Sequence, residues 1–335
     1  MSSTPGTASR PAVQLPLWLV GVVLWGTVLL LAVAHSAQLG NSEAVGTVGV
    51  IFTSIVVEAL PFILIGALVS GAIATYVSDG AFARLARLPR GLQVPGAALA
   101  GVGFPVCECG SVPVAKRLLG RGIDPAAGVA FMLAAPIVNP IVLWSTWVAY
   151  GARHSALEMT LARAGLGLAV AVVVGLVVAR FASRDLLRPS APTAHDHLPR
   201  APGARLPTLM GHVTSDFMFM GKFLVLGAGV AALVQTALPQ SVLSGIGGAE
   251  VVAILTMVLL AFALSLCSEA DAFVAVSFTA FPLSAQLAFL VMGPAFDAKL
   301  AVLYGATFRR RFTLLLVVTA LPITLVGSLV FGAIT

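Results

Sequence analysis

Long apolar runs alternate with short polar segments along the chain. Apolar runs of helical length occur at 15–34, 48–76, 125–150, 158–182, 211–238, 283–304 and 312–333. A helix of about 20 residues crosses a hydrocarbon core of ~30 Å, because each residue advances it by about 1.5 Å. The pattern therefore predicts seven transmembrane helices and an all-α polytopic membrane protein.

Two further apolar segments, 94–121 and 249–281, are interrupted near their centres. The first contains GFPVCECGSVPVA from Gly103 to Ala115, and the second contains LCSEAD from Leu266 to Asp271. Proline removes a backbone donor and glycine loosens the backbone, so the first interruption predicts a broken helix. At membrane depth, non-helical backbone is tolerated only where it is buried in protein or lines a cavity. We therefore expect both interruptions to contribute to a binding site, as in secondary transporters.

The segment 94–121 can either cross the membrane once or turn back as a re-entrant hairpin. A single crossing would place the basic residues of 116–121 and of the linker at 183–210 outside the cell. A hairpin that turns at Cys107 to Gly110 places both groups in the cytoplasm, as the positive-inside rule favours. The segment 249–281 then forms a hairpin that enters from the outside, and the N-terminus lies in the cytoplasm.

A polar, proline-rich and basic linker divides the chain into two halves. The predicted regions are an N-terminal tail with the first transmembrane helix at 1–47, a first repeat with the CEC hairpin at 48–182, a cytoplasmic linker at 183–210, and a second repeat with the CSEAD hairpin at 211–335. Matching positions are Ile65-Gly66-Ala67 with Leu226-Gly227-Ala228, Cys107 with Cys267, Val114-Ala115 with Val274-Ala275, and Pro136 and Asn139 with Pro294 and Asp297. We expect inverted repeats whose hairpin tips meet near the midplane, with parallel repeats as the alternative.

Composition excludes a soluble protein, since 59% of the 335 residues are hydrophobic, 10% are charged, and the mean hydropathy is +1.03. The net charge of +6 comes from lysines and arginines in short loops, so it predicts membrane topology and no nucleic-acid partner. The sequence has no G-x-x-x-x-G-K-[ST] loop, and we expect no enzymatic activity and no cofactor. The expected partners are the lipid bilayer and a small-molecule substrate, with a homodimer as one possible assembly.

All three cysteines, Cys107, Cys109 and Cys267, lie in the two interruptions. A structural disulfide framework would place cysteines in exposed segments, so ligating or reactive thiols are the better interpretation. Two or three soft sulfurs suit a thiophilic species such as trivalent arsenic or antimony, Cu(I) or Hg(II). The alternative is that each buried cysteine is a small hydrophobic residue. We expect no metal site beyond a metalloid substrate on these cysteines.

Three carboxylates, Glu108, Glu269 and Asp271, lie beside the cysteines. Charge at membrane depth costs at least ~2.5 kcal/mol, so such groups face a cavity, form pairs or carry protons. The spacing of Ser268 and Asp271 also fits a capping box at the start of the second hairpin arm, and Ser111 is the corresponding N-cap candidate in the first. Helix starts at these places would offer N–H groups and a positive dipole end to an anion.

Four other polar residues lie within predicted spans and are candidates for the transport pathway or its coupling: Glu58, Asn139, Lys222 and Asp297. Glu58 and Lys222 occupy near-equivalent places in the two repeats, so we expect them to pair or to line the pathway. Lys299 is expected to extend to the membrane interface or to pair with Asp297.

The segments FPVCECGSVPVAKRLL, APIVNPIV and SLCSEADAFVA resemble the signature segments of the bacterial predicted-permease family that includes the ArsP organoarsenical efflux permeases. The resemblance extends from about Glu58 to the last span. It implies a permease of the bacterial inner membrane and, by analogy with the characterised members, export of trivalent organoarsenicals.

These observations favour a secondary transporter that exports a thiophilic species. Thiolates of Cys107, Cys109 and Cys267 would bind the soft centre, and protonation changes at Glu108, Glu269 or Asp271 would couple its release to the proton gradient. One alternative is a small-anion permease that uses the half-helix N-termini. The other is a membrane thiol oxidoreductase in which Cys107 and Cys109 cycle between dithiol and disulfide.

Overall fold

The structure, a computed structural model, describes residues 43–78, 80, 89–104, 106–181, 186–187, 205–237 and 250–335. The predicted span at 15–34, most of the basic loop before 90 and most of the linker at 183–210 lie outside the described residues. The helices are α2 (Glu43–Tyr76), α4 (Arg90–Ala100), the 3₁₀ turn η1 (Gly101–Gly103), α5 (Glu108–Gly120), α6 (Pro125–Val138), α7 (Pro140–Gly151), α8 (Ala156–Phe181), α9 (Arg205–Ala237), α11 (Glu250–Leu264), α12 (Asp271–Ser277), α13 (Leu283–Ala295), α14 (Ala298–Thr307) and α15 (Arg310–Ile334).

Six stretches of the described chain are long and apolar enough to cross a membrane. They are Gly46–Tyr76, Pro125–Gly151, Ala156–Val178, Leu206–Thr236, Leu283–Thr307 and Arg310–Ile334. Each corresponds to one of the predicted spans, and the span at 15–34 lies outside the described residues. Large apolar side chains such as Leu161 and Val318 are more than 60% exposed, as expected for a surface that faces lipid rather than water. The prediction of an all-α polytopic membrane protein is confirmed.

Two of these spans are broken in the middle by a capping residue. Between α6 and α7, Asn139 Oδ1 accepts hydrogen bonds from the backbone N–H groups of Ile141 and Val142, at 2.8 and 3.1 Å. Between α13 and α14, Asp297 Oδ1 accepts a hydrogen bond of 2.6 Å from the backbone N–H of Leu300. Each side chain satisfies donors that a helix start leaves free, so each break begins a new half-helix inside the body.

Helix ends gather at one end of the molecule, which carries the exposed Arg309, Arg310 and Arg311 and is called the basic end below. The ends of α2, α5, α8 and α14 lie there with the starts of α6, α9 and α15. Arg309 N donates to Leu186 O at 3.0 Å, which joins the start of α15 to the segment after α8. Arg121 donates to Ala74 O at 3.3 Å, which joins the segment after α5 to the end of α2.

The first interrupted segment turns back inside the body as a hairpin of α4 and α5. At the far end of α4, Gly101 lies against the backbone of Ala135, which is halfway along the broken span. In the returning arm, Leu118 packs in one cluster with Ala97, Ile123 and Ala127, close to the start of α6. The segment therefore returns to the basic end and does not cross.

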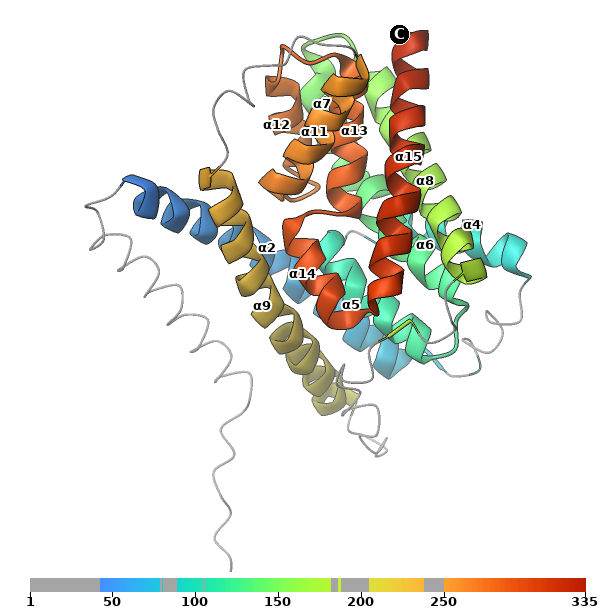
Figure 1. The fold of residues 1–335 in the computed structure, drawn as a ribbon. Coiled ribbons are helices and arrows are strands. Elements are labelled where there is room, and N and C mark those ends of the chain that lie inside the picture. The colour runs from blue at the N-terminus through green and yellow to red at the C-terminus, as the bar shows by residue number, and fades with distance from the viewer. Residues whose placement is uncertain are drawn as a thin grey trace, which may run out of the picture.

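The second interrupted segment forms a hairpin of α11 and α12 at the opposite end. At the start of α11, Glu250 accepts a hydrogen bond of 2.6 Å from Ser284 Oγ, at the start of α13. After α12, the carbonyls of Phe278 and Phe281 accept hydrogen bonds from Gln286 Nε2, also on α13. Both arms therefore begin and end beside the start of α13, near the end of the molecule where the C-terminus lies (Figure 1).

The two halves are interlocked. Helix α2 of the first half packs along α9 of the second, and α8 packs along α15. Close helix contacts occur where glycine allows them: a Cβ added at Gly71 of α2 would lie 3.0 Å from Val213 of α9. An isolated antiparallel bridge joins Leu187 to Phe308. The described helices thus form one body in which the two hairpin tips approach each other from opposite ends.

Candidate functional site

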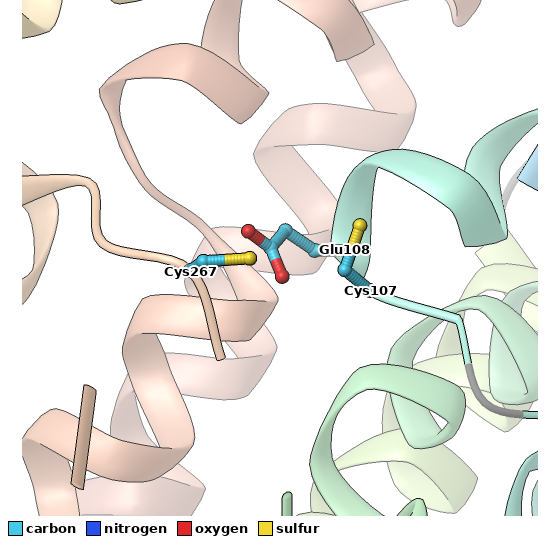
Figure 2. A group of neighbouring side chains, drawn as sticks. All are labelled: Cys107, Glu108 and Cys267. Carbon is cyan, nitrogen blue, oxygen red and sulfur yellow. The ribbon is translucent and has the colours of Figure 1, made fainter. Parts of the chain in front are cut away.

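The two hairpin tips bring two thiols and a carboxylate together in the interior. Figure 2 shows the sulfur of Cys267 facing the carboxylate of Glu108, with the side chain of Cys107 beside them, and the ligand atoms of all three residues lie within 4.8 Å of one another. Cys107 directly precedes α5, Glu108 is its first residue, and Cys267 lies in the irregular segment between α11 and α12. All three side chains are buried. The site is thus assembled from both halves of the chain.

Hydrogen bonds connect the two tips directly. Ser268 Oγ of the second hairpin donates to Glu108 Oε2 of the first at 3.0 Å. Within the second hairpin, the Cys267 thiol donates to Glu269 Oε2 at 2.9 Å. Both carboxylates are therefore oriented by groups from the second tip, and the Cys267 sulfur is held beside them.

A buried lysine on α14 joins both tips. Lys299 Nζ lies 2.7 Å from Glu108 Oε1 and donates to the carbonyls of Ser265 and Leu266 at 3.1 and 2.9 Å. It also lies 3.5 Å from Asp297 Oδ2. The expectation that Lys299 extends to the interface is wrong, since its side chain is only 4% exposed. The expected proximity to Asp297 is present, but the shorter contact is with Glu108.

The second tip is also fixed by a fully buried arginine that sequence reasoning missed. Arg163 on α8 forms two hydrogen bonds of 2.8 Å with the carboxylate of Asp271 and donates to Ser268 O at 3.2 Å. Thr146 Oγ1 of α7 accepts a further bond of 2.8 Å from the same guanidinium. The sequence did contain a signal, because Arg163 is an ionisable residue inside a transmembrane span, and such residues normally have a buried partner.

Cys109 lies close to the same group, because its thiol is within interaction range of the Cys107 thiol, which also interacts with Cys267. Cys109 lines a small pocket together with Ile63 of α2, Met220 and Leu224 of α9, and Lys299 and Leu303 of α14. The three thiols therefore lie near one another: Cys107, Cys267 and Glu108 form one close group, and Cys109 beside Cys107 also lines the pocket. Nothing in the sequence distinguished Met220 from the other apolar residues of its span.

Comparison with known proteins places the chain in a family. A family model described as a predicted permease, ArsP_1, matches residues 45–333. The chain belongs to this family. It is 45% identical over 284 residues to the UPF0718 protein YcgR of Bacillus subtilis (strain 168), a match that covers 83% of this chain and 95% of that protein.

A second relative comes from Streptococcus mutans serotype c (strain ATCC 700610 / UA159) and is named a putative two-component membrane permease complex subunit. It is 34% identical over 285 residues, which cover 84% of this chain and 94% of the relative. No solved structure matches the chain. Family and relatives together support a multi-pass membrane permease.

The residues expected to cap the returning helices of the two hairpins, α5 and α12, do not do so in the structure. Helix α5 begins at Glu108, three residues before Ser111, whose hydroxyl donates to the carbonyls of Glu108 and Met132 at 3.0 Å. Helix α12 has no side-chain cap. Ser268 and Asp271 do not form the expected capping box, because Ser268 bonds Glu108 and Asp271 binds Arg163.

The other polar residues within spans take different positions. Asn139 and Asp297 are the caps of α7 and α14. Glu58 on α2 is half-buried and lies within electrostatic range of Lys299 and Glu108. The expected pairing of Glu58 with Lys222 is not formed, because Lys222 is exposed and its ammonium lies 5.0 and 4.9 Å from the ring centres of Phe219 and Phe223.

The charges around the permease site are unequal. Asp271 is balanced by Arg163, and Glu108 is balanced by Lys299. Glu269 has no basic side chain within 4 Å in the described part of the chain; it accepts hydrogen bonds from Cys267 and Ser268 instead. The site therefore combines soft sulfur donors with carboxylate oxygens, a set that suits a thiophilic or cationic ligand better than an anion.

Proposed function

We propose that this permease is a secondary transporter that exports a thiophilic species bound between the two hairpin tips. The observation that carries the proposal is the approach of Cys107, Glu108 and Cys267 from opposite halves to within 4.8 Å in a buried site. Movement of one half relative to the other would make or break such a site. Proton coupling is assigned to Glu269, which has no basic side chain within 4 Å among the described residues, while the ion pairs of Glu108 with Lys299 and of Asp271 with Arg163 give those carboxylates a structural role.

A trivalent organoarsenical is the proposed cargo, on the strength of the family resemblance and of the two thiols. Reaction of methylarsenite with Cys107 and Cys267 would break two As–O bonds and form two As–S bonds. The two thiol protons leave with the two hydroxyl groups as two molecules of water, and no electrons are transferred. Soft sulfur ligands of this kind are selective for thiophilic centres.

Inverted-topology repeats are proposed as the basis of transport. Corresponding helices of the two halves run in opposite directions. Helix α2 runs toward the basic end and α9 runs away from it. The same holds for the broken span α6–α7 against α13–α14, and for α8 against α15. The first hairpin returns to the basic end and the second to the opposite end. Such halves can expose a central site alternately to the two sides of a membrane.

The proposed location is the bacterial inner membrane, with the basic end and the linker in the cytoplasm. Arg117, Arg121 and Arg309 to Arg311 lie at this end, as the positive-inside rule favours. The name of the Streptococcus mutans relative favours assembly with a second, different component. A homodimer is the alternative assembly.

Two other functions have less support from the geometry. A small-anion permease would use the N-termini of α5 and α12, but their first residues are the acidic Glu108 and Asp271. These carboxylates already interact with the positive ends of the helices and would repel an anion. A thiol oxidoreductase needs accessible thiols, whereas all three cysteines are buried and free.

Uptake of methylarsenite into everted membrane vesicles tests the proposal. The wild type should accumulate methylarsenite in the presence of an energy source, and the Cys107→Ser, Cys267→Ser double variant should not. Ser277→Ala is the matched control, because Ser277 lies on the second hairpin but is exposed, and its hydroxyl donates to Val274 O of its own helix. Methylarsenite should also protect Cys107 and Cys267 of the purified wild type from alkylation, as measured by mass spectrometry. Full transport by the double variant would exclude thiol ligation of the cargo.

A further inference from the structure

A polar cluster joins three helices near the basic end. Arg117 Nη2 of α5 lies 3.0 Å from Asp216 Oδ2 of α9, and its Nε donates to Ser70 Oγ of α2 at 3.1 Å. Ser70 Oγ in turn donates to the same Asp216 oxygen at 2.7 Å. The three side chains, called the Ser70–Arg117–Asp216 cluster below, therefore connect the first hairpin and α2 to the second half of the chain.

The cluster lies on the same three helices as the pocket beside Cys109. Ile63 of α2, Cys109 of α5 and Met220 of α9 line that pocket. Ser70 follows Ile63 by seven residues, which is about 10 Å along a helix at about 1.5 Å per residue. Since α2 runs toward the basic end, Ser70 lies on the basic-end side of the pocket.

The same displacement holds on the other two helices. Arg117 follows Cys109 by eight residues on α5, which also runs toward the basic end. Asp216 precedes Met220 by four residues, or about 6 Å, on α9, which starts at the basic end. The cluster therefore lies between the Cys109 pocket and the basic end.

We infer that cargo reaches the site from the basic end between α2, α5 and α9, and that the Ser70–Arg117–Asp216 cluster is the gate on this path. This inference rests on the proposed function. The side chains of Arg117 and Asp216 are 11% and 15% exposed, so the gate is near the surface, whereas the thiols behind it are buried. Its contacts join the two halves, so relative movement of the halves would separate them and open the path.

A disulfide between α2 and α9 can lock the gate. A Cβ at Gly71 would lie 3.5 Å from the Cβ of His212, which is within the range that disulfides require. The variant Gly71→Cys, His212→Cys should therefore form a bridge next to Ser70 and Asp216 on oxidation. Oxidation should stop methylarsenite uptake into everted vesicles and reduction should restore it, whereas neither single variant should respond. Undiminished uptake by the oxidised double variant would overturn the inference.

Opening the gate gives a second measurement that needs no cargo. Asp216→Asn and Arg117→Gln weaken the cluster, so alkylation of Cys109 by N-ethylmaleimide should accelerate by about tenfold, which corresponds to about 1.4 kcal/mol. Arg180→Gln is the control, because Arg180 is an exposed arginine in the last turn of α8. An unchanged alkylation rate in both gate variants would refute the gate even if methylarsenite binds the thiols. Conversely, faster alkylation without any arsenical binding would leave the gate standing and refute the proposed cargo.

Discussion

Both hairpin tips contact Lys299, but they differ in what else holds their backbone in place. At the first tip, α5 begins directly after Cys107, and Gly110 of its first turn packs against Gly66 of α2, where a Cβ on Gly66 would overlap the Gly110 backbone. At the second tip, residues 265–270 are irregular, and Ser265 has a positive φ of 47°. This tip is held by the side chains of Lys299 and Arg163.

The difference shows two ways of fixing non-helical backbone inside a membrane. Besides the ion pair of Glu108 with Lys299, close packing of two glycines fixes the first tip by shape, which cannot change unless the helices move. Ion pairs and hydrogen bonds fix the second tip by charge, and such contacts can be exchanged by rotation of side chains. The first tip should therefore be sensitive to added volume, and the second to lost charge.

The largest effect is expected at the second tip. Arg163→Met would leave Asp271 buried without its partner, and removal of one member of a buried pair costs roughly 3–5 kcal/mol. Thermal unfolding in detergent should show a strongly destabilised protein. Arg163→Lys, which keeps one charge but not the paired geometry, should recover part of the loss.

Arg153→Met provides the control, because Arg153 is exposed just after α7. If Arg163→Met were as stable as this control, charge would not be what holds the second tip.

At the first tip, added volume should have an intermediate effect. Gly66→Ala forces α2 and α5 apart at Gly110, and overpacking of this kind costs roughly 1–3 kcal/mol. Gly46→Ala on the same helix has no atom within 4 Å of the new Cβ and should be neutral or slightly stabilising. A comparison of the two unfolding temperatures measures the difference. Equal stabilities would contradict the close approach of the two helices.

The smallest effect is expected where the tips meet. Ser268→Ala removes the hydrogen bond to Glu108, and a bond to a charged group contributes roughly 1.5–3 kcal/mol at most. Because Lys299 still holds Glu108, we expect a loss of stability of about 1 kcal/mol or less, as for an ordinary hydrogen bond, together with faster alkylation of Cys107. Ser277→Ala should change neither quantity. If Ser268→Ala lowered the free energy of unfolding as much as Arg163→Met, the second tip would be held mainly by its contact with the first tip.

Local features of the sequence predicted the helices and their interruptions. Apolar length identifies spans, and proline and glycine mark the interruption of the first hairpin, because these effects act within one turn of helix. The breaks at Asn139 and Asp297 were not predicted, since 125–150 and 283–304 were interpreted as continuous spans and both residues as pathway candidates. The matching positions of Cys107 and Cys267 in the two halves also predicted that they would meet. Each of these predictions requires only the local sequence and the approximate correspondence between the two halves.

Partners of charged side chains could not be predicted in the same way. The spacing of Ser268 and Asp271 fits a capping box, but Arg163 and Glu108 take these side chains in the folded protein. A local helix cap and a distant ion pair would use the same carboxylate oxygens of Asp271. Because both side chains are buried, the ion pair with Arg163 forms instead of the cap. The partner of Lys299 was likewise decided by the approach of α14 to the first hairpin, which no local pattern encodes.

The distance in sequence between Arg163 and Asp271 has a consequence for biosynthesis. The two residues are 108 positions apart, so α8 leaves the ribosome well before its counter-charge exists. At about 5–20 residues per second, the delay is on the order of 5 to 20 s. During this time the unpaired Arg163, in the third turn of α8, opposes membrane insertion by less than the roughly 2.5–3.5 kcal/mol that applies at a helix centre. The apolar residues of α8 must therefore keep the helix in the bilayer until the second hairpin is synthesised. Only then can Asp271 pair with Arg163 and remove the cost of the buried charge.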